Sequence, residues 1–86
     1  MGPTTPGFNY ARHLETEQDR DDYACGAFAT LQIALKHDEQ DTQVGEKSYE
    51  SMVRNGFCPA MIRDVAECIQ GYSQLAATAI FDKLQQ

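Results

Sequence analysis

Apolar residues recur at steps of three and four over two long stretches of this chain, which is the spacing of a helix buried along one face. The first stretch carries a stripe formed by Ala24, Phe28, Leu31 and Leu35. The second carries a stripe formed by Ile62, Val65, Ile69, Tyr72, Ala76, Ile80 and Leu84. Nowhere do apolar and polar residues alternate for long enough to predict a β-strand. The pattern therefore predicts an all-α fold.

The first two predicted helices are bounded by residues that favour helix starts and ends. Thr16 is suited to cap a first helix, which we expect to run from about residue 16 to residue 37. A short second helix is expected over residues 46–55. It should stop at Asn55 and Gly56, because glycine readily adopts the left-handed conformation that ends many helices. Phe57 would then fold back onto this helix.

A third helix should begin at Pro59, since proline is favoured at the first helical position, and should run to about Leu84. Gly71 lies in its interior, where glycine costs up to about 1 kcal/mol relative to alanine and can mark a bend. The three segments predict a small three-helix bundle in which the first and third helices form a long antiparallel pair. We expect residues 15–86 to form this single domain, preceded by a flexible leader over residues 1–14 that contains two prolines and two glycines.

The charge of the chain is concentrated in one third of its length. The net charge is −6, from 13 acidic and 7 basic residues. Residues 15–46 contain nine acids and two bases, whereas the rest of the chain has four acids and five bases. Direct binding to nucleic acid or to an anionic membrane is disfavoured, because both need a basic surface. No apolar run is long enough for a transmembrane helix. A basic protein surface is the partner that this charge favours.

The acids form two blocks, over residues 15–22 and 38–41, and two interpretations of them stay open. They are either a solvated face that keeps the helix in solution or a docking site for a basic partner. The helix dipole explains part of the first block, because negative charge is stabilising at a helix start. The second block follows the expected helix end and has no such explanation. In the docking interpretation, the candidate partner-binding acids are Asp19, Asp21, Asp22, Asp38, Glu39 and Asp41.

Two apolar features do not fit an isolated bundle. Gly26, Ala29 and Ile33 lie opposite the main stripe of the first helix, so that helix would be apolar on two sides. These three residues are the candidate self-association face of a homodimer, and Ile33 is also a candidate apolar anchor for a partner. Phe81 falls among polar residues of the third helix. It is either an exposed partner anchor or part of a frayed last turn that folds inward.

The pattern of cysteine and histidine residues does not predict chemistry. Cys25, Cys58 and Cys68 are odd in number and have no secretion signal before them, which favours free thiols and a cytoplasmic location. None of them has the spacing of a zinc ligand. Cys58 precedes a helix start and should have a lowered pKa, but no histidine is near it in sequence. We find no catalytic motif, and we expect no enzyme activity, cofactor or metal.

A helix-turn-helix is a further interpretation of residues 48–70, since two short helices meet there at a glycine-containing turn. The second of these helices offers Arg63 as its single base-reading arginine, next to Asp64. Lysines that would neutralise phosphates are missing. The DNA-binding interpretation is therefore the weakest of those considered.

Size, charge and helix pattern together predict a small acidic, non-enzymatic protein-binding module. It would act as an inhibitor or antagonist on a basic partner surface, including one that otherwise holds nucleic acid. Antitoxins, immunity proteins and phage-encoded inhibitors of host defence work in this way as a class, and the analogy is one of size and charge. The alternative is a homodimeric structural or adaptor subunit in which the acids only solubilise the chain.

Overall fold

Four α-helices and one short 3-10 helix make up the described part of the chain. The computed structural model describes residues 9–37 and 42–86, of which 34–37 and 42 enter only through the helices that contain them. The elements are the 3-10 helix η1 (Asn9–His13) and the helices α1 (Glu17–His37), α2 (Thr42–Arg54), α3 (Pro59–Ile69) and α4 (Gln74–Leu84). The all-α prediction is confirmed. The prediction of three helices is wrong, because residues 59–84 form two helices.

The break between α3 and α4 follows from a capping residue that the apolar spacing does not reveal. The Ser73 hydroxyl accepts a hydrogen bond from the Ala76 backbone N–H at 3.2 Å, which starts a new helix. Ahead of it, the Tyr72 and Ser73 N–H groups both bond to the Ile69 carbonyl at 2.8 Å, which closes α3. The bend predicted at Gly71 is thus a complete turn, and the predicted long antiparallel pair does not form.

The end of α2 has the backbone geometry that its sequence predicts. Gly56 adopts a φ of 81°, the left-handed conformation. Its N–H bonds to the Val53 carbonyl at 3.0 Å, and the Phe57 N–H bonds to the Met52 carbonyl at 3.0 Å. These two bonds define a Schellman motif. The start of α2 differs from prediction, because the helix begins at Thr42, four residues before residue 46.

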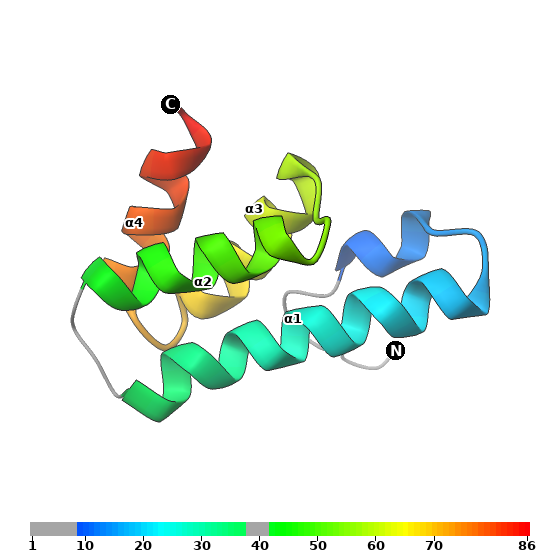
Figure 1. Ribbon diagram of the computed structural model, residues 1–86, viewed down its shortest axis with the longest axis horizontal. Helices are drawn as coiled ribbons and strands as arrows, with labels where there is room; N and C mark the ends of the chain where they lie inside the picture. Colours follow the sequence, from blue (N-terminus) through cyan, green and yellow to red (C-terminus); the bar gives the residue numbers. More distant parts are fainter. Residues whose placement is uncertain (1–8, 38–41) are drawn as a thin grey trace.

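The helices are arranged around α2, as Figure 1 shows. The longest helix, α1, lies along the length of the molecule, and α2 runs back beside it in the opposite direction. The most extensive packing is between α2 and α4, followed by α1 with α2 and α3 with α4. Gly45 makes the α2–α4 contact close: a Cβ atom placed on it would lie 2.3 Å from the Ala76 carbonyl oxygen.

The core draws on all four helices, but α1 presents a different face to it than its apolar spacing predicts. The buried apolar side chains include Tyr23, Ala27, Leu31, Val44, Met52, Ile62, Val65, Ala66, Ile69, Ala76, Ala77 and Ile80. Phe28 was expected in the core but is 56% exposed, whereas Thr30 is fully buried. The Thr30 hydroxyl donates to the Gly26 carbonyl at 2.9 Å, so its burial leaves no unpaired hydroxyl. Because Thr30 is buried with its hydroxyl hydrogen-bonded, the buried face of α1 can include Thr30 and leave Phe28 exposed.

Part of the predicted leader lies against the helices. η1 contacts both α1 and α3. Its Tyr10 packs edge-on against Tyr23, with ring centroids 5.7 Å apart, and Leu14 is half-buried beside the core. Residues 9–14 therefore belong to the packed part of the structure.

Candidate functional site

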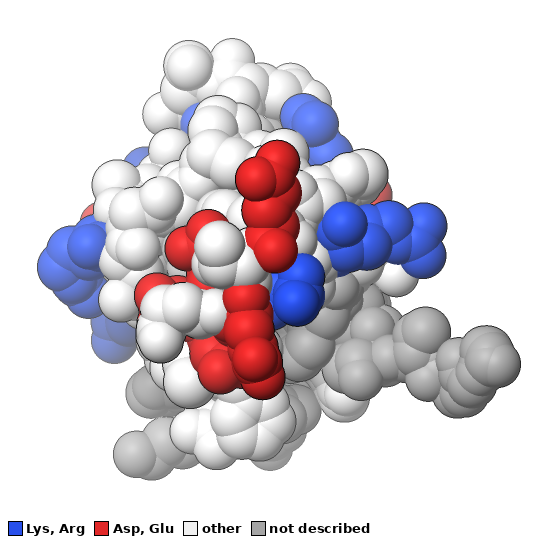
Figure 2. All heavy atoms as spheres, turned by 90° about the vertical axis from the view of Figure 1, so that its right-hand side faces the viewer, with Lys and Arg blue, Asp and Glu red and all other residues white. Residues whose placement is uncertain are grey.

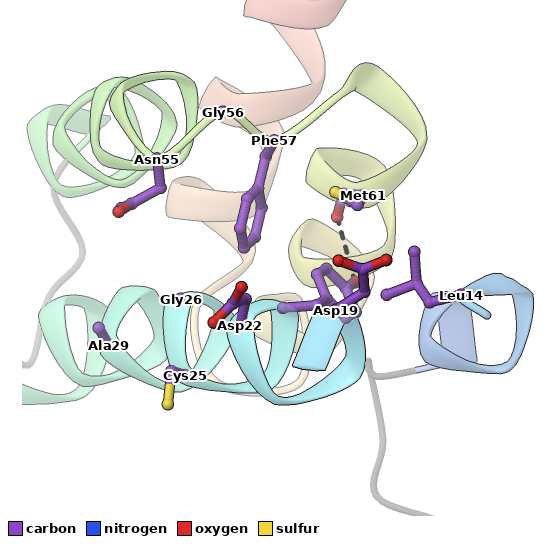
Figure 3. Close-up of a pocket in the computed structure, with 11 residues that line it drawn as sticks. Leu14, Asp19, Asp22, Cys25, Gly26, Ala29, Asn55, Gly56, Phe57 and Met61 are labelled. Atoms are coloured by element: carbon purple, nitrogen blue, oxygen red, sulfur yellow. Dashed lines mark hydrogen bonds between the residues drawn. The ribbon is translucent and has the colours of Figure 1, made fainter. Parts of the chain in front are cut away.

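An open groove of about 710 Å³ runs between α1 and the connection from α2 to α3. Figure 3 shows it from the side, with the side chains of the connection pointing toward α1. The groove is lined by Leu14, Asp19, Asp22, Tyr23, Cys25, Gly26, Ala29, Asn55, Gly56, Phe57 and Met61. Six of these residues are exposed, so the groove is accessible from solvent. Its size is in the range of protein ligand-binding clefts.

Phe57 forms the centre of the groove. Its ring points toward α1 and lies next to Tyr23, with a centroid separation of 5.2 Å (Figure 3). Gly26 makes this approach feasible, because a Cβ atom there would be 2.7 Å from the tip of the Phe57 ring. Phe57 is only half-buried, as are Leu14 and Met61. The groove therefore offers apolar surface that the chain itself does not fully cover.

Two carboxylates stand on the rim of the groove. Asp19 and Asp22 lie three residues apart on α1 and are both exposed. Asp22 accepts a hydrogen bond from the Gln18 side-chain amide at 2.9 Å, and the Asp19 backbone N–H donates to the capping Thr16 hydroxyl at 3.0 Å. Across residues 9–33 and 43–86, neither carboxylate forms an ion pair with a basic side chain. Both negative charges are available to a ligand.

The rim belongs to a larger acidic face at the start of α1. Figure 2 looks at this end of the molecule and shows acidic side chains gathered in its middle, with basic ones to either side. All of the acids in residues 15–22 are exposed. Arg20, the single base among them, donates to the Leu14 carbonyl at 2.9 Å. Its guanidinium thus holds the chain ahead of α1.

The structure brings together some of the sequence-predicted site residues and separates others. Asp19, Asp22, Gly26 and Ala29 line one groove, although they were predicted as parts of two different sites. Asp21 is exposed on α1 but does not line the groove. The remaining acidic candidates, Asp38, Glu39 and Asp41, lie outside the described residues.

Three of the four apolar candidates pack against other parts of the chain. Gly26 lies under Phe57, and Ile33 is a partly buried residue packed on the core. Phe81 is also partly buried against the core, but it lies within α4 and not in a frayed last turn. Ala29 alone in this group is exposed.

Sequence reasoning missed a buried hydrogen-bond network at Asp64. This carboxylate is only 8% exposed. It accepts a bond of 2.5 Å from the Tyr23 hydroxyl and one of 2.9 Å from the Tyr10 backbone N–H. Burial, followed by the bond to Asp64, raises the pKa of the Tyr23 phenol well above its ordinary value. The only sequence signal was an acid placed next to the apolar stripe of a helix.

Cys58 lies at the start of a helix and next to a tyrosine hydroxyl. It occupies the N-cap position of α3, and its Sγ lies 3.7 Å from the Tyr10 hydroxyl oxygen. Burial of the thiol opposes ionisation, but the nearby Met61 N–H, Tyr10 hydroxyl and Ala60 N–H favour the thiolate and outweigh it. The pKa of Cys58 is therefore lowered, in the direction predicted from its place before a helix.

The lowered pKa predicts a distinct pH dependence of Cys58 alkylation. Because the thiolate is the reactive form, Cys58 should react with iodoacetamide at a pH midpoint below that of N-acetylcysteine. Tyr10→Phe should move this midpoint upward, whereas Tyr72→Phe, at an exposed tyrosine, should leave it unchanged. Peptide mass spectrometry after quenching at each pH measures the reaction of each cysteine separately. A midpoint equal to that of N-acetylcysteine, or one insensitive to Tyr10→Phe, would contradict the assignment.

The other two cysteines have simpler surroundings. Cys68 is buried, and burial followed by the charge of Asp64 raises its pKa. Cys25 is exposed, and its sulfur points away from Phe57 in Figure 3. Among the described residues, no three His, Cys, Asp or Glu side chains are grouped so that they could hold a metal ion. Within the same residues, no helix combines the length and apolar character needed to cross a membrane.

Comparison with known proteins found no matching family model, no matching curated protein and no matching solved structure.

Proposed function

We propose that this protein is a small acidic binding module without catalysis of its own. It docks through the start of α1 on a basic surface of a partner protein and acts as an inhibitor or antagonist of that partner. Where the basic surface otherwise holds nucleic acid, the acidic face competes for it by presenting carboxylates in place of phosphates.

The observation that carries this proposal is a set of acids that the described chain leaves without basic partners. Residues 15–22 place five exposed acids and one base on two turns of a helix and its N-terminal approach. The single base, Arg20, is engaged with the Leu14 carbonyl. Like charges at this spacing repel each other, and the helix dipole favours only the acids of the first turn, so the dipole does not account for all five. Unpaired carboxylates on one face raise the association rate with a basic partner.

The proposal predicts salt-dependent capture of a basic partner. The tagged protein should retain the partner from an extract of its source cells at about 0.05 M salt and release it at about 0.5 M, because exposed charges are then screened. A variant with Glu17→Gln, Asp19→Asn, Asp21→Asn and Asp22→Asn should retain much less. Glu50→Gln combined with Glu67→Gln removes exposed acids elsewhere and should retain the same amount. Mass spectrometry identifies and quantifies the retained proteins.

Two results would contradict the proposal. One is capture that is equally strong at both salt concentrations. The other is equal capture by the four-residue variant and the wild type. The antagonist part has its own test, in which nucleic acid added to the loaded resin should displace the partner. If nucleic acid does not displace the partner although capture still depends on salt, the partner's basic surface does not bind nucleic acid and serves another function.

A further inference from the structure

We propose that the groove beside the acidic face binds a cationic amphipathic helix of the partner. The apolar side of that helix lies on Phe57, Met61 and Leu14, and its arginines or lysines meet Asp19 and Asp22. This inference rests on the proposed function, and it adds the location of the site and the chemistry of the segment that fills it.

The charges around the groove select a cation. Among the described residues that line it, the two charged ones, Asp19 and Asp22, are both acidic, and none is a Lys, Arg or His. Both carboxylates are exposed and form no ion pair within the described ranges 9–33 and 43–86. An arginine at the rim can engage a carboxylate through two parallel hydrogen bonds, which fixes its orientation as well as its charge.

The floor of the groove selects an apolar contact next to that cation. Leu14, Phe57 and Met61 are each half-buried, and they come from three different parts of the chain that converge here (Figure 3). An aromatic ring with an adjacent methionine gives a surface that adapts to the side chains placed on it. A partner with positive charge alone would leave this surface exposed to water.

The shape of the groove favours a helix over an extended strand. Asp22, Gly26 and Ala29 follow one face of α1 at steps of four and three, and the last two have little or no side chain. The Phe57 ring covers Gly26, so a second helix can lie on this ring and contact α1 on either side of it, at Asp22 and Ala29, as in the helix-in-groove mode of peptide recognition. All described residues that line the groove belong to a helix, a helix cap or a loop. Among them there is no strand edge to which an extended peptide could add by backbone hydrogen bonds.

A second copy of this chain is a poorer occupant than a cationic partner. The chain carries a net charge of −6, and docking on the groove would bring another acidic molecule against Asp19 and Asp22. Like charges placed against each other across an interface oppose association.

A set of designed peptides tests the proposal. The probe is a peptide of leucine and arginine about 18 residues long, roughly five helical turns, with its leucines on one face. One control has the same composition in an order that spreads the leucines around the helix. A second control replaces every arginine by glutamate. We expect only the first peptide to shift the amide NMR signals of Gly26, Ala29 and Phe57 in the isotope-labelled full chain.

Matched variants separate the groove from the acidic face as a whole. Ala29→Trp fills the groove from an exposed position and should weaken binding of the probe by at least about tenfold. Phe28→Ala, on the same helix but outside the groove, should not change the affinity. Asp19→Asn with Asp22→Asn should weaken binding by about two- to fivefold per carboxylate. Glu17→Gln with Asp21→Asn removes the same amount of charge at positions outside the groove. It should weaken binding of the probe less than the Asp19 and Asp22 double variant does.

Each result that departs from this pattern has a defined meaning. If both arginine peptides bind equally and both double variants weaken them equally, the groove proposal is wrong and the acidic-face proposal stands. If neither arginine peptide binds at low salt, both proposals lose their support. Concentration-dependent dimerisation that Ala29→Trp abolishes would assign the groove to a second copy and overturn the partner-helix proposal. Circular dichroism of each variant confirms that a loss of binding is not a loss of folding.

Discussion

Substituting Gly45 by alanine should destabilise the protein by about 2–3 kcal/mol, as overpacking of a close helix contact does. A methyl group at this position would lie 2.3 Å from the Ala76 carbonyl oxygen and 2.7 Å from the Ala79 Cβ. Neither obstacle is a mobile side-chain tip, so α4 must move away from α2. The free-energy cost of this displacement outweighs the gain of about 1 kcal/mol that alanine has over glycine in a helix. Thermal denaturation should show a midpoint lowered by about 10–20 °C.

Two other glycines serve as controls for this substitution. A Cβ atom on Gly71 would meet only the Cys68 carbonyl at 3.4 Å, so Gly71→Ala should be neutral or stabilising by up to about 1 kcal/mol. At Gly26 the obstacle is the tip of the Phe57 ring, which can rotate away. Gly26→Ala should therefore cost less than Gly45→Ala. An unchanged midpoint for Gly45→Ala would mean that α2 and α4 are not packed backbone to backbone.

Replacing Asp64 by alanine should cost about 3 kcal/mol, because two hydrogen bonds to a buried charged group are lost together. One of them comes from the buried Tyr23 hydroxyl and the other from the Tyr10 backbone N–H. The second bond ties η1 to α3, so its loss has a local consequence as well. Hydrogen exchange of the Tyr10 amide should become much faster in Asp64→Ala than the global loss of stability explains.

The matched variants for this network are Asp64→Asn and Tyr23→Phe. The asparagine keeps an acceptor oxygen and should cost less than the alanine. A double-mutant cycle with Tyr23→Phe measures the energy of the side-chain bond separately from the backbone bond. If the cycle gives no coupling, or the Tyr10 amide exchanges at the wild-type rate in Asp64→Ala, then Asp64 does not join these elements.

The helical class could be predicted from apolar spacing, and some element ends could be predicted from single residues. Gly56 and Pro59 have strong conformational preferences, and the structure has a left-handed turn and a helix start at these two positions. The helix start at Ser73 was missed, because the apolar stripe continues across it without interruption. In a continuous apolar stripe, nothing local distinguishes a bend at Gly71 from a complete break.

The candidate site was only partly predictable, for a different reason. Asp19 and Asp22 were identified from the local concentration of acids, and Gly26 and Ala29 from their position on a second apolar face. Their common groove depends on Phe57, which lies between 28 and 38 positions further along the chain, and no local pattern indicates that contact. The Asp64 network was missed for the same reason, since a buried acid is stable only with tertiary partners.

The close contact of Gly45 with Ala76 also bears on how the protein can move. Where two helix backbones meet with almost no side chain between them, few side-chain rotamers can change to accommodate motion. One helix can then slide along the other only if the whole contact separates. We expect α2 and α4 to behave as a rigid unit. Adjustment to a ligand would then fall on the four residues that connect α2 to α3, with Gly56 as the hinge and the Phe57 ring as the part that swings.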